Sequence, residues 1–249
     1  MIFSSGGAGD PPPDEYDSTS GGKWTHLQPQ PKGNPKQPSQ DRQYGNFANP
    51  DGGFGPEIGF ARTLYANGDK WLAIVKAAWG GTGMAQDWNP SDPGDSGSCY
   101  RALVSETKGA IAAARAQGIT LRLRALVWVQ GESDADATAA PSYEKALGNM
   151  IAALRKDLDS PHLIALLAVN TQFGGGTTPF ISKIVEAQQA LAAKDPRSAY
   201  VDTATATIAN SAHFDTAGTL DIGRRFAQTL LKVEANSAAP SSEASVPAQ

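Results

Sequence analysis

Between about residues 56 and 233, short apolar runs alternate with longer helical segments, and this alternation limits the possible folds more than any other feature. Strand-like runs are predicted at 72–79, 121–129, 162–169 and 199–202. Helices are predicted at 57–66, 105–118, 141–158, 178–194 and 220–233. Strands that alternate with helices of ten or more residues indicate right-handed βαβ units and a mostly parallel sheet covered on both faces. The sequence therefore predicts an α/β fold.

The chain divides into three parts by composition. Residues 1–55 are rich in Gly, Pro, Asn, Gln and Ser, which favours a long loop segment over regular structure. Residues 56–234 carry the alternating pattern, and residues 235–249 have no core-forming content and are expected to form a disordered tail. With 249 residues, we expect one sizeable domain rather than two.

Charge and composition argue against several classes of partner and cofactor. The formal net charge is −4 and no basic stripe is present, which argues against nucleic acid as a partner. The single cysteine, Cys99, excludes an internal disulfide and a cysteine-based zinc cluster. No apolar run reaches the roughly 18 to 20 residues of a membrane span, and the N-terminus as given has no signal-peptide pattern. Nothing in the sequence indicates an oligomeric state or a compartment.

Gly80 and Gly81 follow the predicted strand 72–79 directly. Ligands of parallel α/β sheets bind beyond the carboxyl ends of the strands, and adjacent glycines there can direct backbone N–H groups at a developing oxyanion. An ordinary tight turn is the alternative, and it is the more common role of such a pair. It is not a Walker loop, because no Lys-Ser or Lys-Thr follows.

His213 is the histidine best placed for catalysis. The others, His26 and His162, lie in the Pro-rich segment and beside a strand, whereas His213 lies in a polar loop before the last predicted helix. Imidazole suits proton transfer near neutral pH. A structural hydrogen-bonding role is the alternative.

The stretch after the strand 121–129 gathers one amide and three carboxylates: Gln130, Glu132, Asp134 and Asp136. The acids could form a solvated turn, bind a cation or orient a catalytic base. They lack the spacing and terminal Glu of an EF-hand, so we expect no metal. Gln130 could donate to an oxyanion, and Glu132 could hold an imidazole as the acid of a triad does.

Four blocks resemble a known family: "GPEIGFAR", "KAAWGGTGMAQDW", "VWVQGESDA" with "SYEKALGNMIAALRKDL", and "HFDTAGTLDIGRRFA". They are similar to the sialate O-acetylesterase-like domain and the acetyl xylan esterases of carbohydrate esterase family 6, in the SGNH-hydrolase superfamily. The resemblance covers about residues 55–227.

That resemblance implies a three-layer α/β/α sandwich with a five-stranded parallel sheet. It also implies deacetylation of O-acetylated sugars through a serine nucleophile and an acyl-enzyme, without a cofactor, in a family often secreted or periplasmic. His213 matches the family's base, Gly80 and Gly81 match the glycine part of its oxyanion hole, and Gln130 matches the amide part.

Two positions depart from the family pattern. The family's nucleophile lies in a Gly-Gln-Ser-Asn stretch that this sequence lacks, and Ser4 and Ser5 follow only three residues, so we expect the first strand to be missing or truncated. Asn210 stands where many members have an aspartate, which makes Glu132 the candidate acid here.

Three functions are therefore compatible with the sequence. The first is a carbohydrate O-acetylesterase, impaired if the nucleophile is absent. The second is a non-catalytic glycan-binding descendant of such an enzyme. The third is a structural or assembly module whose loops contact a partner.

Overall fold

The computed structural model describes residues 2–4, 24–27 and 54–238 of the chain. Its α-helices are α1 (Glu57–Ala66), α2 (Met84–Asp87), α3 (Ser98–Ala116), α4 (Ala140–Asp157), α5 (Ile181–Lys194) and α6 (Thr216–Ala238). Its strands are β1 (Ile2–Ser4), β2 (Thr25–His26), β3 (Ala73–Val75), β4 (Ala125–Val129), β5 (Ile164–Ala168) and β6 (Ser198–Tyr200).

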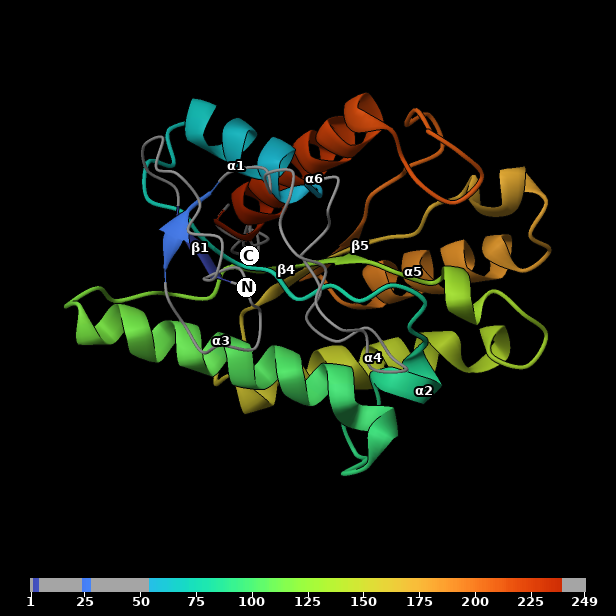
Figure 1. Cartoon of the computed structure of the whole chain (residues 1–249), viewed down its shortest axis with the longest axis horizontal. Coiled ribbons are helices and arrows are strands. Elements are labelled where there is room, and N and C mark those ends of the chain that lie inside the picture. Colours follow the sequence, from blue (N-terminus) through green and yellow to red (C-terminus); the bar gives the residue numbers. More distant parts are fainter. Residues whose placement is uncertain (1, 5–23, 28–53, 239–249) are drawn as a thin grey trace, which may run out of the picture.

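The elements form three layers, as expected for an α/β/α fold (Figure 1). The parallel sheet β4–β5–β6 lies in the middle, with α1 and α6 on one face and α3, α4 and α5 on the other. Successive residues of β5 supply both cores, because side chains alternate across a strand. Leu167 packs into the core on the α4 side, and Leu166 packs into the core beneath α6.

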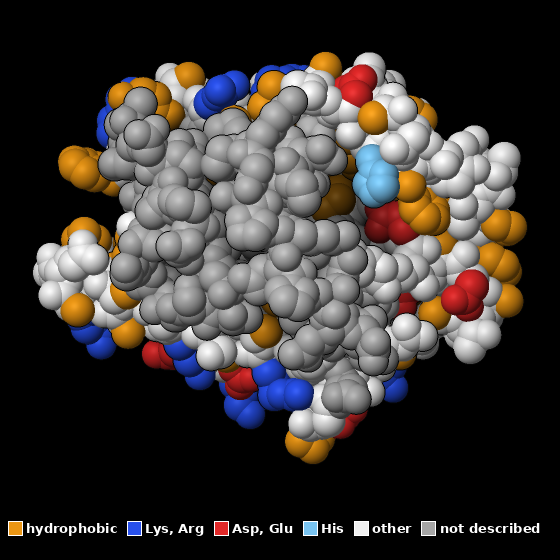
Figure 2. Space-filling model, viewed as in Figure 1, with side chains coloured by type: hydrophobic (Ala, Val, Ile, Leu, Met, Phe, Trp, Pro, Cys, Tyr) orange, Lys and Arg blue, Asp and Glu red, His pale blue; other side chains and the backbone are white. Residues whose placement is uncertain are grey.

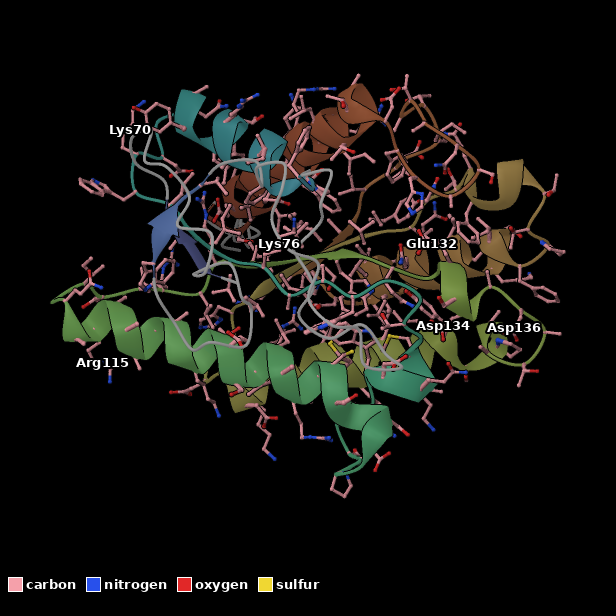
Figure 3. The ribbon with its side chains drawn as sticks, viewed as in Figure 1. Lys70, Lys76, Arg115, Glu132, Asp134 and Asp136 are labelled. Carbon is pink, nitrogen blue, oxygen red and sulfur yellow. The ribbon has the colours of Figure 1, made fainter. Side chains whose placement is uncertain are left out.

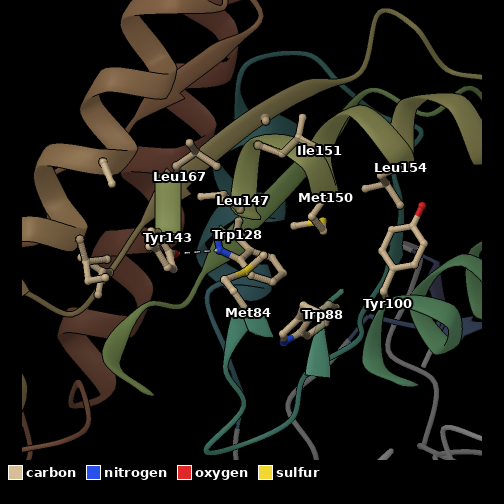
Figure 4. Packing of buried hydrophobic residues seen from close by; sticks show 14 of the residues in the cluster. Met84, Trp88, Tyr100, Trp128, Tyr143, Leu147, Met150, Ile151, Leu154 and Leu167 are labelled. Atoms are coloured by element: carbon tan, nitrogen blue, oxygen red, sulfur yellow. Dashed lines mark hydrogen bonds between the residues drawn. The ribbon is translucent and has the colours of Figure 1, made fainter. Parts of the chain in front are cut away.

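The core on the α4 side is rich in aromatic rings (Figure 4). Trp88 packs edge-on against Trp128, with ring centroids 4.8 Å apart. The Trp128 indole N–H points at the Tyr143 hydroxyl over 3.5 Å. This core therefore anchors the end of β4, from which the acidic loop departs.

The expected five-stranded parallel sheet is smaller in the structure. Among the described residues the parallel sheet has three strands, and β1, β2 and β3 form a second sheet in the order β2-β1-β3. The strand predicted at 72–79 is limited to Ala73–Val75, because its antiparallel partner β1 supplies three residues. Likewise β4 begins at Ala125, whose register partner Ile164 is the first residue of β5.

The predicted helices all form, and all but one have shifted ends. Helix α1 has the predicted bounds, whereas α3 begins at Ser98 and α6 at Thr216, earlier than predicted. Asp215 accounts for the early start of α6, because its carboxylate accepts the Gly218 N–H at 2.7 Å as an N-terminal cap does.

The division at residues 55 and 234 stays a prediction. Most of the N-terminal segment and most of the tail lie outside the described residues, although β1 and β2 fall within the segment predicted as loop. None of the helices described here has the length and apolar character needed to cross a bilayer.

Candidate active site

Hydrogen bonds join the loops that follow β3, β4, β5 and β6. The labelled side chains of Glu132, Asp134 and Asp136 lie at one end of the molecule, just beyond β4 (Figure 3). On the face seen in Figure 2, a histidine side chain borders an acidic side chain. The individual bonds show what each predicted residue does.

Gln130 ties the loop after β4 to the glycine loop after β3. Its side-chain amide donates to the Thr82 carbonyl at 2.9 Å and to Asp134 Oδ2 at 2.6 Å. The Tyr143 hydroxyl donates to its backbone and side-chain oxygens at 2.8 and 3.1 Å. Both amide hydrogens thus already have acceptors. Gln130 as an oxyanion donor stays a prediction that this arrangement does not support.

Asp134 also connects the loop after β4 to the loop after β3. It is 3% exposed, and its two carboxylate oxygens accept the Met84 backbone N–H at 3.0 and 3.1 Å. Burial raises the pKa of Asp134, against the opposing effect of the bond from Gln130. This carboxylate therefore holds the first residue of α2 and, with it, the glycine loop.

Glu132 is bonded to the loop after β5. Its Oε1 accepts the Asn170 backbone N–H at 2.8 Å, and the Asn170 side chain donates to the Ala212 carbonyl at 3.2 Å. Burial raises the pKa of Glu132, and the bond from Asn170 works in the opposite direction. Glu132 is thus connected to the residue before His213 through one intermediate side chain.

His213 contacts a different partner from the one expected. The ring Nδ1 lies 3.1 Å from Asn210 Oδ1, and no ion pair joins His213 to Glu132 in the part of the chain that the structure describes. The ring is exposed. The expectation that Glu132 directly orients the ring stays a prediction, and the observed contact favours Asn210.

Gly80 and Gly81 form an exposed turn after β3. Gly81 has a φ of 71°, and a Cβ there would meet nothing within 4 Å. Within residues 54–238 no protein acceptor takes up either N–H. Their assignment to an oxyanion hole stays a prediction that these available donors support.

Gly131 is required by its surroundings. Its φ is 148°, and a Cβ would come within 2.4 Å of Ile184 and 3.1 Å of Val169. A side chain at this position would displace the acidic loop. The glycine of "VWVQGES" is therefore a packing requirement as well as a turn.

The cation alternative finds no support in the described residues, which contain no group of three His, Cys, Asp or Glu side chains able to hold a metal. Asp136 instead accepts the backbone N–H groups of Thr138 and Ala139 at 2.6 and 2.9 Å, just before α4. Each acid of the cluster thus binds a backbone segment. The three carboxylates therefore have structural roles in this loop.

The two nucleophile candidates, Ser4 and Ser5, are close to the N-terminus. Ser5 lies outside the described residues, and Ser4 ends β1, where the backbone alone is described. Their assignment stays a prediction.

The loop after β5 is the part of the site that the sequence analysis missed. Asn170 and Thr171 follow the buried apolar run that ends at Val169, one residue after β5, and a polar pair at the carboxyl end of a strand is the available signal. The sequence does not distinguish Asp134 from the neighbouring acids, because its burial depends on contacts with residues far away in the sequence, such as Met84.

Comparisons with known proteins agree with this architecture. The family profile described as "Carbohydrate esterase, sialic acid-specific acetylesterase" matches residues 25–232. A protein of Arabidopsis thaliana, solved by X-ray crystallography at 1.6 Å resolution, is similar with 29% sequence identity and a TM-score of 0.60, over 72% of this chain and 69% of that one. No curated protein matches the chain.

Proposed function

Because the chain belongs to the family of carbohydrate esterases described as sialic acid-specific acetylesterases, we propose that it hydrolyses acetyl esters of O-acetylated sugars. The observation that carries this proposal is the placement of His213. Its exposed ring is held by Asn210, in a loop that Asn170 and Glu132 join to the ends of β5 and β4. An exposed imidazole at this edge of a parallel sheet suits general base catalysis.

The proposed reaction has two half-reactions. In the first, His213 takes the proton of a serine hydroxyl while the serine oxygen attacks the acetyl carbonyl, and the proton then passes to the sugar oxygen as its bond to the acetyl carbon breaks. In the second, His213 takes a proton from water as the water oxygen attacks the acyl carbonyl, and His213 then returns that proton to the serine oxygen as its bond to the acetyl carbon breaks and acetate leaves. The N–H groups of Gly80 and Gly81 are the proposed donors to the oxyanion.

Acetate release tests the proposal. The full chain is assayed on a chromogenic acetyl ester, on O-acetylated sialic acid and on acetylated xylo-oligosaccharides. We expect His213→Gln to lower kcat/KM by about 100-fold or more, because general base catalysis contributes that much. His162→Gln removes another exposed histidine and serves as the matched control. Equal activity of the His213→Gln variant and the wild type would contradict the proposal.

A labelling experiment identifies the nucleophile. A serine-reactive phosphonate that labels the active protein, followed by mass spectrometry of the labelled peptide, identifies the residue. We expect Ser4→Ala or Ser5→Ala to abolish labelling and turnover together. Labelling of another serine would reassign the nucleophile.

The missing Gly-Gln-Ser-Asn stretch favours a second candidate, a glycan-binding protein without hydrolysis. Binding of O-acetylated sugars by calorimetry, with no acetate released and no serine labelled, would establish that function instead.

A further inference from the structure

The side chain of Asn210 makes three contacts through one oxygen. Its Oδ1 accepts the backbone N–H groups of Ala212 and His213, each at 2.9 Å, and lies 3.1 Å from the His213 Nδ1. The turn is closed further by the Ala209 N–H, which donates to the His213 carbonyl at 2.9 Å. The side-chain oxygen of Asn210 is thus fixed by the backbone of the turn that carries His213.

These contacts determine which end of the amide faces the ring. An Asn side chain has an acceptor oxygen and a donor nitrogen of nearly the same shape, so the hydrogen-bond partners decide which of the two faces a given group. Here two backbone N–H groups point at the atom in question, so it must be the acceptor. The Nδ1 of the neutral ring must then carry a hydrogen to bond with it, which leaves Nε2 unprotonated.

We propose that Asn210, a neutral amide, is the positioning residue that keeps His213 in the Nδ1–H tautomer, with Nε2 ready to accept a proton. Glu132 acts at a greater distance, by holding Asn170 and through it the Ala212 carbonyl. The role of Nε2 as the catalytic base rests on the proposed esterase function. The tautomer itself does not.

The amide fulfils this role differently from a carboxylate. It accepts the Nδ1 hydrogen before and after Nε2 takes up a proton, so the ring orientation is kept throughout. It carries no negative charge, however, so it stabilises the resulting imidazolium less than an aspartate would. Asn210→Asp should therefore retain the tautomer and raise kcat, whereas Asn210→Ala should lose both the tautomer and turnover.

Nitrogen-15 NMR of the full chain, labelled on its histidines, tests the tautomer directly. Long-range proton–nitrogen correlations distinguish the two neutral tautomers, and His213→Gln identifies the His213 signals. We expect the Nδ1–H form in the wild type and in Asn210→Asp. In Asn210→Ala we expect the Nε2–H form to predominate.

Two controls separate the roles of neighbouring residues. Asn89→Ala removes a similar exposed hydrogen bond, in which Asn89 Oδ1 accepts the Ser91 N–H and no histidine takes part. This variant should leave His213 in the Nδ1–H form. Glu132→Gln keeps an oxygen for Asn170 and should also retain that form. An Nε2–H tautomer in the wild type, no change in Asn210→Ala, or a tautomer change in Glu132→Gln would overturn the proposal.

Kinetics on the chromogenic acetyl ester supply the second readout. We expect Asn210→Ala to lower kcat by more than about tenfold with a smaller effect on KM, because the lost contact acts on the base and not on substrate binding. A kcat for Asn210→Ala within about twofold of wild type in an active enzyme would overturn the positioning role. If the tautomer responds as expected but no acetyl ester is hydrolysed by any variant, the proposed function fails and the assignment of Asn210 stands.

Discussion

Each carboxylate of the loop after β4 binds a different stretch of backbone. Glu132 accepts from Asn170, Asp134 from Met84, and Asp136 from Thr138 and Ala139. These bonds connect the loop to the loop after β5, to α2 and to the start of α4. The acidic cluster therefore holds together the backbone segments around the site. Asp134 is the most buried of the three acids, so its effect on stability should be the clearest.

The stabilising contribution of Asp134 should depend on pH. Burial raises its pKa above the ordinary 3.8, so the folded protein favours the protonated form. This contribution is fully present below 3.8 and is lost as pH rises through the raised value. We expect the free energy of unfolding of the wild type, relative to Asp134→Asn, to fall as the pH rises from 3.8 to the raised pKa of Asp134, by at most about 1.4 kcal/mol for each pH unit.

Urea unfolding at a series of pH values measures this difference. Asp136→Asn controls for the removal of an exposed carboxylate from the same loop. A difference between wild type and Asp134→Asn that grows with pH would show that the bonds to Met84 and Gln130 outweigh the cost of burial.

The helices could be predicted from the sequence more completely than the sheets. The apolar period of α1 gives both of its ends, because local spacing determines which face is buried. The ends of β3 depend instead on β1, which is about 70 residues away in the sequence and pairs with β3 over three residues. The Asn210–His213 contact is local, yet the sequence alone does not show the orientation of the amide.

Helices α1 and α6 approach closely at glycines that the sequence analysis did not consider. A Cβ on Gly223 would come within 2.1 Å of the Pro56 carbonyl oxygen, and one on Gly59 within 2.2 Å of the Leu220 carbonyl oxygen. Real Cβ atoms do not approach backbone so closely. The two helices therefore pack through these glycines over the face of the sheet.

We expect Gly223→Ala to lower the free energy of unfolding by roughly 1 to 3 kcal/mol, because the helices must separate to admit the methyl group. The higher helix propensity of Ala, worth up to about 1 kcal/mol, should not compensate. Gly109→Ala in α3 is the matched control, since its Cβ would meet nothing within 4 Å, and it should stabilise slightly. Equal stabilisation of both variants in urea unfolding would contradict the close packing.

The whole molecule has two cores that share one strand. Leu166 and Leu167 are both fully buried, and they lie on opposite faces of β5. The buried indoles Trp88 and Trp128 belong to the core on the α4 side alone. Tryptophan fluorescence should therefore report mainly on that side, whereas far-UV circular dichroism reports on helices of both layers.

We expect the two layers to unfold together, because β5 contributes to both cores and cannot leave one without leaving the other. Leu166→Ala and Leu167→Ala should each lower the free energy of unfolding by about 2 to 5 kcal/mol, as large-to-small substitutions in a core do. Ile119→Ala, at a side chain that is 51% exposed, should change it by less than about 0.5 kcal/mol. Fluorescence and circular dichroism should give the same urea midpoint for every variant. The informative case is Leu166→Ala, whose cavity lies on the face away from the buried indoles: a circular dichroism midpoint that falls while the fluorescence midpoint stays at the wild-type value would show that the α1–α6 layer unfolds by itself.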